Sequence, residues 1–326
     1  MTDQAASDIA MPVETPSLGM PRHHLAVFAG LLVFMLVAPF VLYPVFLMKV
    51  MCFALFACAF NLLIGFGGLL SFGHAMFLGS AGYASAHAAK VWGFTPELAI
   101  LFGTAVALVL GAVAGMLAIR RQGIYFAMIT LALSQMIYFV ALQAKFTGGE
   151  DGIQSVPRGF LFGLIDLREP MAMYAVVTVI FLAGFVLIWR VVHSPFGQVL
   201  KAIRENEPRA ISLGYDADRY KLMAFVISGG IAGLAGATKA IVFQLASLTD
   251  VHWTMSGEVV LMTLLGGLGT IFGPVVGAAV IITMQNYLAQ LGAWVTVVQG
   301  VIFVICVLAF RRGIIGELGH WLKKPL

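Results

Sequence analysis

The side chains that most often ligate metals or attack substrates are scattered along this chain. The cysteines Cys52, Cys58 and Cys306 fall inside long apolar runs, where a cysteine is usually a small buried hydrophobe. The sequence has no G-x-x-x-x-G-K-[ST] phosphate loop. No metal-ligand spacing occurs among the histidines, which are His23, His24, His74, His87, His193, His252 and His320. The residues predict no catalytic centre, no metal site, no nucleic-acid-binding module and no cofactor bound by this chain.

Composition indicates a membrane protein. Of 326 residues, 61% are hydrophobic and 10% charged, against about 25% charged in an ordinary soluble domain. Crossing about 30 Å of hydrocarbon takes roughly 20 helical residues. Apolar runs of about that length lie near 25–47, 50–66, 98–119, 123–144, 171–192, 220–243 and 290–310, with glycine-broken apolar stretches at 67–89 and 258–288. The pattern predicts an all-α polytopic membrane protein with about ten transmembrane helices, some of them short or glycine-broken.

The basic residues predict the orientation. With ten spans and both termini inside, one side holds most of the 19 lysines and arginines: Arg22, Arg120, Arg121, Arg190, those of 194–221, Arg311, Arg312, Lys323 and Lys324. The other side holds Lys49, Lys90, Lys145, Arg158 and Arg168, with Lys239 near a helix end. The richer side is cytoplasmic by the positive-inside rule. Parity requires 258–288 to cross twice, as passes at 258–270 and 273–288 joined at Gly273-Pro274, or to re-enter without crossing. The sequence leaves both open.

These boundaries give a domain plan. We expect a polar cytoplasmic tail at 1–24, one transmembrane domain at 25–312 and a cytoplasmic tail at 313–326. Within the domain, 194–219 is a cytoplasmic loop and 145–170 an external loop. The first of these loops is a charged island that cannot lie in lipid. Ser194-Pro195 and Glu207-Pro208 each predict a helix start, and Gly214 ends the segment.

The island is also where energy could enter. Ion-coupled transport needs acids buried in the spans, and Glu258 is the only acid at a span boundary. The remaining interpretation is a membrane pore whose energy comes from elsewhere. The apolar face of the helix after Pro208, formed by Ala210, Ile211 and Leu213 beside Arg209, suits a groove on a partner. An amphipathic helix lying on lipid headgroups fits the same pattern.

Glycine clusters mark the candidate pathway. Glycine permits broken helices beside a cavity and also close helix packing, and the sequence does not separate these two uses. Polar residues near the clusters, or inside a span, could line a pathway or form interhelical hydrogen bonds. The candidates are Asn61, Gly67, Gly68, Ser71, His74, Gln135, Gly266 and Gly267.

Six stretches resemble the permease family of ABC importers for branched-chain amino acids, specifically the subunit with the longer amino-terminal region. They cover most of the chain in the family's order. The stretches are NLLIGFGGLLSFGHAMFLG at 61–79, GIYFAMITLALSQ at 123–135, TGGEDGI at 147–153, SPFGQVLKAIRENEPRAISLGYD at 194–216, YKLMAFVISGGIAGLAGA at 220–237 and SGEVVLMTLLGGLGTIFGPVVGAA at 256–279.

The resemblance implies a non-enzymatic permease subunit in the bacterial inner membrane, in contact with membrane lipid. Its implied partners are a second homologous permease, two cytoplasmic ATPase subunits that bind ATP-Mg, and a periplasmic binding protein that delivers leucine, isoleucine or valine. Related permeases serve urea, short amides or aromatic acids, and a secondary transporter is a further alternative. The ATPase-docking loop would comprise Glu205, Glu207, Arg209, Ala210, Ile211, Leu213 and Gly214, although Pro208 stands where the family pattern has glutamate.

The external loop at 145–170 carries balanced charges, which suit a polar and transient interface. We therefore expect the periplasmic binding protein to contact Glu150, Asp151 and Arg158.

Overall fold

The computed structural model describes residues 22–163, 165–289, 294–309 and 313–321. The chain divides into two units, 1–41 and 42–326. In the first, helix α1 (Arg22–Val41) is described, whereas most of the predicted tail lies outside the described residues. The second unit begins before Pro44, the first residue of α2 (Pro44–Asn61). The predicted first span, 25–47, was therefore too long, because Pro44 holds Tyr43 in an extended conformation (φ −65°, ψ 122°).

Two long helices form the centre of the second unit. They are α2, continued by one turn of π-helix (Leu62–Phe66), and α9 (Ala217–Phe243). In their most apolar stretches 83% and 78% of the residues are buried. The α9 sequence SGGIAGLAGA allows this, since small residues let neighbouring helices approach closely. Helices α3 (His74–Lys90) and α4 (Pro96–Ala118) pack against α9, and α6 (Pro170–His193) packs against α2.

Five helices are long and apolar enough to cross a membrane within the described residues: α2 with its π-helical turn, α4, α5 (Ile124–Gln143), α6 and α9. Several other apolar helices are shorter. They include α10 (Trp253–Gly266), α11 (Gly273–Leu288) and α12 (Trp294–Ala309). The expected cytoplasmic tail at 313–326 holds a helix, α13 (Gly313–Trp321). The count of ten spans and the side of the termini stay predictions.

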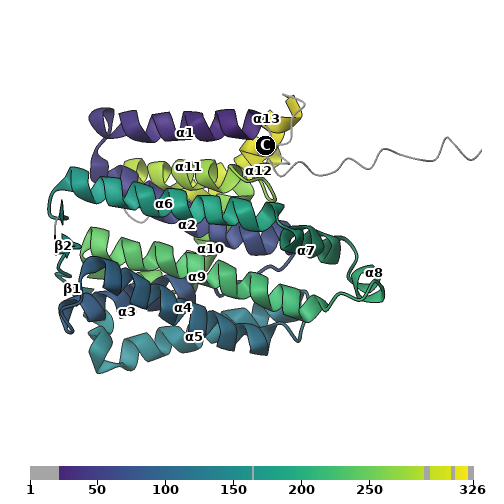
Figure 1. Cartoon of the computed structure of the whole chain (residues 1–326), viewed down its shortest axis with the longest axis horizontal. Coiled ribbons are helices and arrows are strands. Elements are labelled where there is room, and N and C mark those ends of the chain that lie inside the picture. The colour runs from purple at the N-terminus through teal and green to yellow at the C-terminus, as the bar shows by residue number, and fades with distance from the viewer. Residues whose placement is uncertain (1–21, 164, 290–293, 310–312, 322–326) are drawn as a thin grey trace, which may run out of the picture. The chain divides into compact units, whose positions relative to one another are not determined.

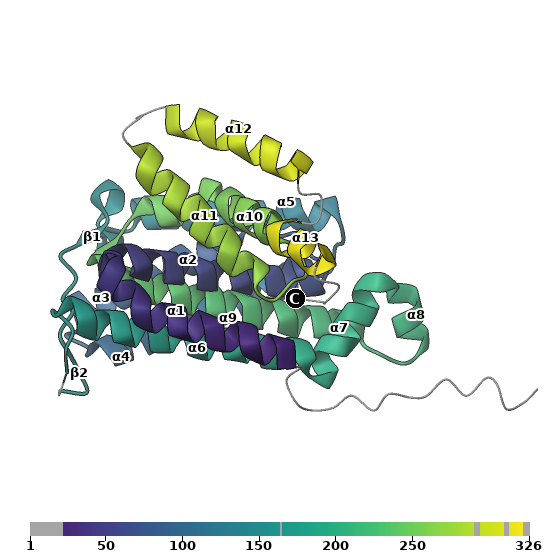
Figure 2. The same ribbon diagram turned by 90° about the horizontal axis from the view of Figure 1, so that it is seen from above.

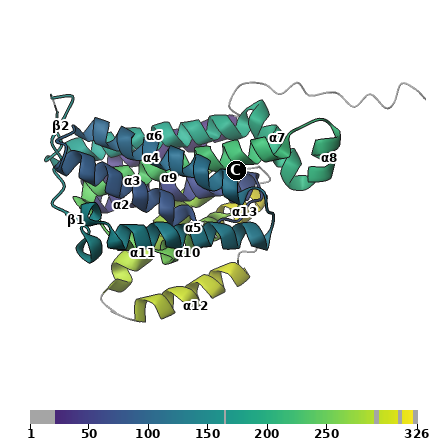
Figure 3. The same ribbon diagram turned by 90° about the horizontal axis from the view of Figure 1, so that it is seen from below.

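The connections of the second unit gather at two opposite ends (Figures 1 and 3). One end carries α7 (Pro195–Glu205) and α8 (Glu207–Ser212). The other carries β1 (Ile153–Gln154) paired with β4 (Leu245–Ala246), and β2 (Phe160–Leu161) paired with β3 (Ile165–Asp166). Single turns of 3₁₀-helix lie at Lys145–Thr147, Gly149–Asp151 and Leu248–Asp250. These strands span only two residues each, so the described fold is overwhelmingly helical.

Glycines close α10 and α11 into an antiparallel hairpin, which lies beside α2 (Figure 2). A Cβ on Gly277 would stand 1.8 Å from the carbonyl oxygen of Met262, and one on Gly266 would stand 1.9 Å from that of Gly273. The two helices therefore pack in close contact at these glycines. Residues 267–272 join them. Gly273-Pro274, predicted as the joint, instead begins α11. At 14 and 16 residues, they are about 21 and 24 Å long.

Candidate functional site

Local capping shapes the 194–219 loop, and both of its predicted helices are confirmed. The hydroxyl of Ser194 accepts a hydrogen bond from the Gly197 amide at 3.4 Å, which caps α7. The second cap is one residue earlier than predicted. The side-chain oxygen of Asn206 accepts a hydrogen bond from the Arg209 amide at 3.1 Å, and Glu207 is the first residue of α8. Asparagine is among the best N-cap residues, since its amide oxygen satisfies a free N–H of the first turn.

The short helix α8 has one face packed against its own chain. Ala210 is only 2% exposed and lies in a small apolar cluster with Ile203 of α7 and Ala217 of α9. Val199 and Tyr220 pack around this cluster. This contact fixes α8 against the ends of α7 and α9.

The other face of α8 is open to solvent. Ile211 is 55% exposed and Leu213 is 70% exposed, and the charged residues Glu205 and Arg209 are exposed beside them. The predicted apolar face therefore divides: Ala210 packs inward, whereas Ile211 and Leu213 are available to a partner.

Glu207 anchors α8 to two other parts of the loop end. Its Oε1 accepts a hydrogen bond from the ammonium of Lys221 at 2.6 Å and another from the amide of Gln122 at 2.9 Å. The Lys221 side chain is only 4% exposed. Gln122 belongs to the α4–α5 connection, next to Arg120 and Arg121. The predicted grouping of this connection with the charged island on one side of the molecule thus agrees with the contacts.

Gly214 ends α8 in a conformation that suits glycine, with φ at +92°. The amide of Tyr215 donates to the Ala210 carbonyl at 3.2 Å, and the amide of Gly214 donates to the Ile211 carbonyl at 2.9 Å. These two bonds form the Schellman arrangement, which satisfies the last carbonyls of a helix. The turn returns the chain toward α9 and holds Leu213 outward.

The loop reaches the first glycine cluster through Arg204. Its guanidinium Nη1 donates a hydrogen bond to the Gly65 carbonyl, in the π-helical turn that continues α2. A Cβ on Gly68 would stand 2.8 Å from the Arg204 Cγ. Lys201 lies over the Phe66 ring, 5.4 Å from its centroid. Burial lowers the pKa of the Lys201 ammonium, while the carboxylate of Glu205 acts in the opposite direction.

Asn61 joins the two glycine clusters. Its amide nitrogen donates to the Thr270 carbonyl at 2.8 Å, and its oxygen accepts from the Gly269 amide at 3.0 Å. A Cβ on Gly65 would stand 2.3 Å from that oxygen, so this close approach requires glycine. We call Asn61, Gly65, Arg204, Gly269 and Thr270 the loop junction. It ties α7, the end of α2 and the α10–α11 turn to one another.

Four more predicted pathway residues lie at or next to this junction. Gly67 faces Leu200 of α7, Gly68 faces Arg204, and Gly266 and Gly267 lead into the turn that Asn61 holds. The other three lie apart from it. Ser71 is fully buried and accepts a hydrogen bond from the Gly73 amide at 3.2 Å, and Gln135 lies partly exposed on α5.

His74 is fully buried and links three helices. Its Nε2 is 2.8 Å from the hydroxyl of Ser228, which donates to the Ala59 carbonyl at 2.5 Å. The rings of Phe60, Phe77 and Phe225 meet it edge-on. These contacts give His74 a role in joining α2, α3 and α9.

At the opposite end, the TGGEDGI stretch forms a tight turn. Gly152 has φ +67°, and a Cβ there would stand 2.2 Å from the Ala246 carbonyl oxygen. Of the predicted binding-protein contacts, Glu150 and Asp151 are exposed. Arg158 is partly buried, and its Nη2 donates to the Val242 carbonyl at 2.7 Å. Arg158 therefore ties the loop to the end of α9.

Sequence reasoning noted Lys239 and Glu258 but did not predict the polar contacts that they form near this end. The Lys239 ammonium lies 2.5 Å from Asp250 Oδ1, and the Gln285 amide donates to Glu258 Oε2 at 3.1 Å. Charges within apolar runs, as at Lys49 and Lys239, are costly and gather with partners. That signal could have identified them, but no spacing indicates which residues meet.

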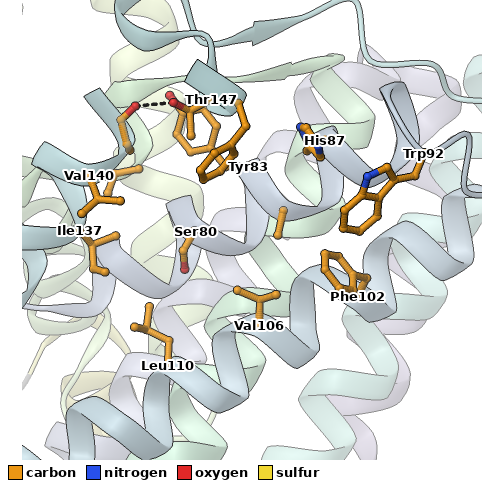
Figure 4. A pocket seen from close by; sticks show the side chains of 14 residues that line it. Ser80, Tyr83, His87, Trp92, Phe102, Val106, Leu110, Ile137, Val140 and Thr147 are labelled. Atoms are coloured by element: carbon orange, nitrogen blue, oxygen red, sulfur yellow. Dashed lines mark hydrogen bonds between the residues drawn. The ribbon is translucent and has the colours of Figure 1, made fainter. Parts of the chain in front are cut away.

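An apolar pocket of about 420 Å³ lies between α3, α4 and α5. Tyr83 and His87 of α3, Phe102 and Leu110 of α4 and Val140 of α5 line it (Figure 4). The Tyr83 hydroxyl and His87 Nδ1 are buried without a hydrogen-bond partner among the described residues. Because the lining side chains carry no lysine, arginine, aspartate or glutamate, the pocket suits an apolar group better than a doubly charged solute.

Comparison with known proteins now decides the family. A family model described as the permease component of branched-chain amino acid transport systems matches residues 42–307. The chain belongs to this family. It is an ABC permease subunit with a transport role and a multi-pass protein of the bacterial inner membrane.

The names of individual relatives give different solutes. The high-affinity branched-chain amino acid permease protein LivM of Escherichia coli is 24% identical over 288 residues, covering 81% of this chain and 68% of LivM. The ribose import permease protein RbsC of Bacillus subtilis is 29% identical over 239 residues, covering 68% and 70%. A probable branched-chain amino acid permease protein LivH of Methanocaldococcus jannaschii is 25% identical over 125 residues, covering 37% of each chain. No solved structure matches the chain.

Proposed function

We propose that this permease subunit translocates leucine, isoleucine and valine as half of a heterodimer with a second, LivH-like permease. Relatives named LivM and LivH support this pairing. In the same proposal, two cytoplasmic ATPase subunits bind ATP-Mg and supply the energy, while this chain binds no cofactor. A periplasmic binding protein delivers the amino acid to the end that carries 145–170.

One observation carries the energetic part of the proposal: α8 presents Ile211 and Leu213 outward while Ala210 fixes it inward. A short helix with a rigid base and an exposed apolar edge suits insertion into a groove of a partner domain. Arg204 of the same loop donates a hydrogen bond to the Gly65 carbonyl in the first glycine cluster. Movement of an attached ATPase would therefore act directly on the helix ends at the loop junction.

The test is uptake by the reconstituted complex of both permeases, the ATPases and the binding protein. We expect radiolabelled leucine uptake that requires ATP and the binding protein, is blocked by orthovanadate, and is competed by isoleucine and valine. This chain purified alone should hydrolyse no ATP.

The same assay separates the alternatives. Ribose is the second candidate solute, because RbsC is 29% identical over 68% of this chain. Competition by ribose, urea, short amides or aromatic acids, with none by isoleucine or valine, would replace the branched-chain assignment. Uptake by the permeases without ATPase subunits would instead indicate a secondary transporter.

A further inference from the structure

The apolar pocket between α3, α4 and α5 has no role in the proposed function. Its volume of about 420 Å³ falls in the range of small-molecule sites, roughly 300 to 1,000 Å³. Three of its lining residues are more than half exposed: Trp92 and Val140 at 52% and Phe146 at 59%. The pocket therefore reaches the surface of the second unit and is not a sealed cavity.

The wall of the pocket is apolar. Its lining side chains include no lysine, arginine, aspartate or glutamate, and the Tyr83 hydroxyl and His87 Nδ1 are themselves buried. An α-amino acid in the pocket would leave its carboxylate and its ammonium without a charged partner, which is costly. A hydrocarbon chain leaves no polar group unpaired, and it supplies the van der Waals contacts that the atoms around a void lack.

The opening of the pocket lies on two helices that are long and apolar enough to cross a membrane, α4 and α5. In their most apolar stretches only 33% and 28% of the residues are buried within this chain. The exposed side chains next in sequence to lining residues are apolar as well: Leu101, Val109, Met136 and Phe139. Since lipid tails are as apolar as leucine, this surface suits contact with acyl chains.

The pocket runs from the ends of these helices to about the middle of α4 (Figure 4). Aromatic rings gather at the first of these places. The centroid of the Trp92 ring lies 5.2 Å from that of Phe102 and 5.4 Å from that of His87. The Phe146 ring lies 5.9 Å from His87. Tryptophan in particular favours the headgroup level of a membrane.

The depth of the pocket matches one leaflet of a bilayer. From Phe102, beside the aromatic rings, to Leu110 the helix α4 rises about 12 Å. The hydrocarbon core of a membrane is about 30 Å thick, so one leaflet contributes about half of that. A chain that enters at the aromatic rings would therefore reach the level of Leu110 near the middle of the bilayer.

We propose that the pocket holds one acyl chain of a membrane phospholipid. The ester end of the chain lies at the level of Trp92, and its methyl end lies near Leu110. Helix α3 forms the floor of the site, and α4 and α5 form its sides. The chain adds contacts to α5, which is the least buried of the five candidate spans among the described residues. The site is independent of the solute that the permease carries.

The test is photo-crosslinking of the assembled transporter, both permeases with the ATPases, in nanodiscs. The nanodiscs contain phosphatidylethanolamine with a photoactivatable diazirine in the middle of one acyl chain, and mass spectrometry maps the labelled residues. Lipids that merely surround the complex can label the exposed faces of α4 and α5. The readout is therefore label on Ser80 and Ala84, the half-buried residues that α3 contributes to the pocket. We expect both to be labelled, and unlabelled phospholipid to compete.

Variants that fill the pocket should exclude the chain. Ala84→Phe should lower the label on Ser80 at least about tenfold, because the added ring occupies the space of the chain. The smaller Ala84→Leu should lower it in the same direction and is used if the ring prevents assembly. Ala105→Phe is the matched control, because it adds the same ring at an exposed position of α4 outside the pocket. It should leave the label on Ser80 unchanged.

Four results would overturn the site. The first is a wild-type complex without label on Ser80 or Ala84, and the second is equal label on Ser80 in the filled variants and the control. The third is label that forms in this chain alone but not in the assembled complex, which would assign the pocket to a side chain of the second permease. The fourth is label that excess leucine displaces and unlabelled phospholipid does not, which would assign the pocket to the solute.

Discussion

The guanidinium of Arg204 donates a hydrogen bond to the backbone carbonyl of Gly65, 139 positions away in the sequence. Arg204 belongs to the polar loop, and Gly65 to the π-helical turn that continues a central membrane-spanning helix. A backbone carbonyl in such a turn is not fully committed to the helix ladder, so it can accept a bond from outside. This bond attaches the loop directly to the end of α2.

Arg204→Ala should uncouple transport from ATP hydrolysis. The loss of a hydrogen bond from a charged donor costs about 1.5 to 3 kcal/mol, so we expect leucine uptake to fall about tenfold or more. Ile211 and Leu213 are untouched, so the ATPase should still co-purify. The matched control is Arg219→Ala, which removes a highly exposed arginine that pairs only locally with Asp216. Equal uptake in both variants would mean that the loop junction does not transmit movement of the ATPase to the membrane helices.

Leu213→Asp should detach the ATPase subunits. The substitution places an unpaired charge where an apolar side chain, 70% exposed in this chain, would be buried by a partner, at a cost of several kcal/mol. We expect uptake to be lost and the ATPase to co-purify poorly, with the second permease still bound. Gln198→Asp adds the same charge at an exposed polar position of α7 and should be tolerated. Normal ATPase association in Leu213→Asp would mean that α8 is a membrane-surface helix and not a docking site.

Gly214→Val should weaken the same association by a different route. A β-branched residue strains a backbone held at φ +92°, at a cost of about 1 to 3 kcal/mol, and so misplaces Leu213. Gly214→Asn is the control, because asparagine tolerates positive φ better than other residues. Pull-down of the ATPase should therefore rank glycine first, asparagine second and valine last. The reverse order of asparagine and valine would contradict the conformational explanation.

Gly277→Ala should destabilise the α10–α11 hairpin. Its Cβ would stand 1.8 Å from the Met262 carbonyl oxygen, so the helices must separate, at a cost of about 1 to 3 kcal/mol or more. We expect a lower melting temperature in detergent and a smaller folded fraction in size-exclusion chromatography. Gly257→Ala is the internal control, because a Cβ there meets nothing within 4 Å. Equal melting temperatures would mean that the hairpin is packed more loosely than described.

Gln154→Cys tests the orientation. Gln154 is exposed in β1, and two of the three native cysteines, Cys52 and Cys58, are buried, so the variants are made in a Cys306→Ser background. An impermeant thiol reagent added to the periplasmic side of intact cells should label Gln154→Cys. It should label Arg121→Cys, at the opposite end, only after permeabilisation. The opposite labelling pattern would invert the predicted topology.

Much of the local structure could be predicted from the sequence. The helices α7 and α8 follow from Ser194-Pro195 and from the residues around Pro208, because caps act within one helical turn. Gly214 ends α8 for the same local reason. Membrane class follows from composition, because hydrocarbon tolerates few charges. The predicted first span, 25–47, was too long because the break at Tyr43-Pro44 lies in a run that is apolar on both sides.

Only the tertiary structure decided which predicted residues act together. Ala210, Ile211 and Leu213 have similar apolar character, and packing against Ile203 and Ala217 alone separates the inner residue from the outer two. Asn61 meets Gly269 across more than 200 residues. Sequence determines the polarity and local conformation of each segment by itself. The partner of a buried amide or charge depends on how distant helices pack, and no spacing along the chain encodes that.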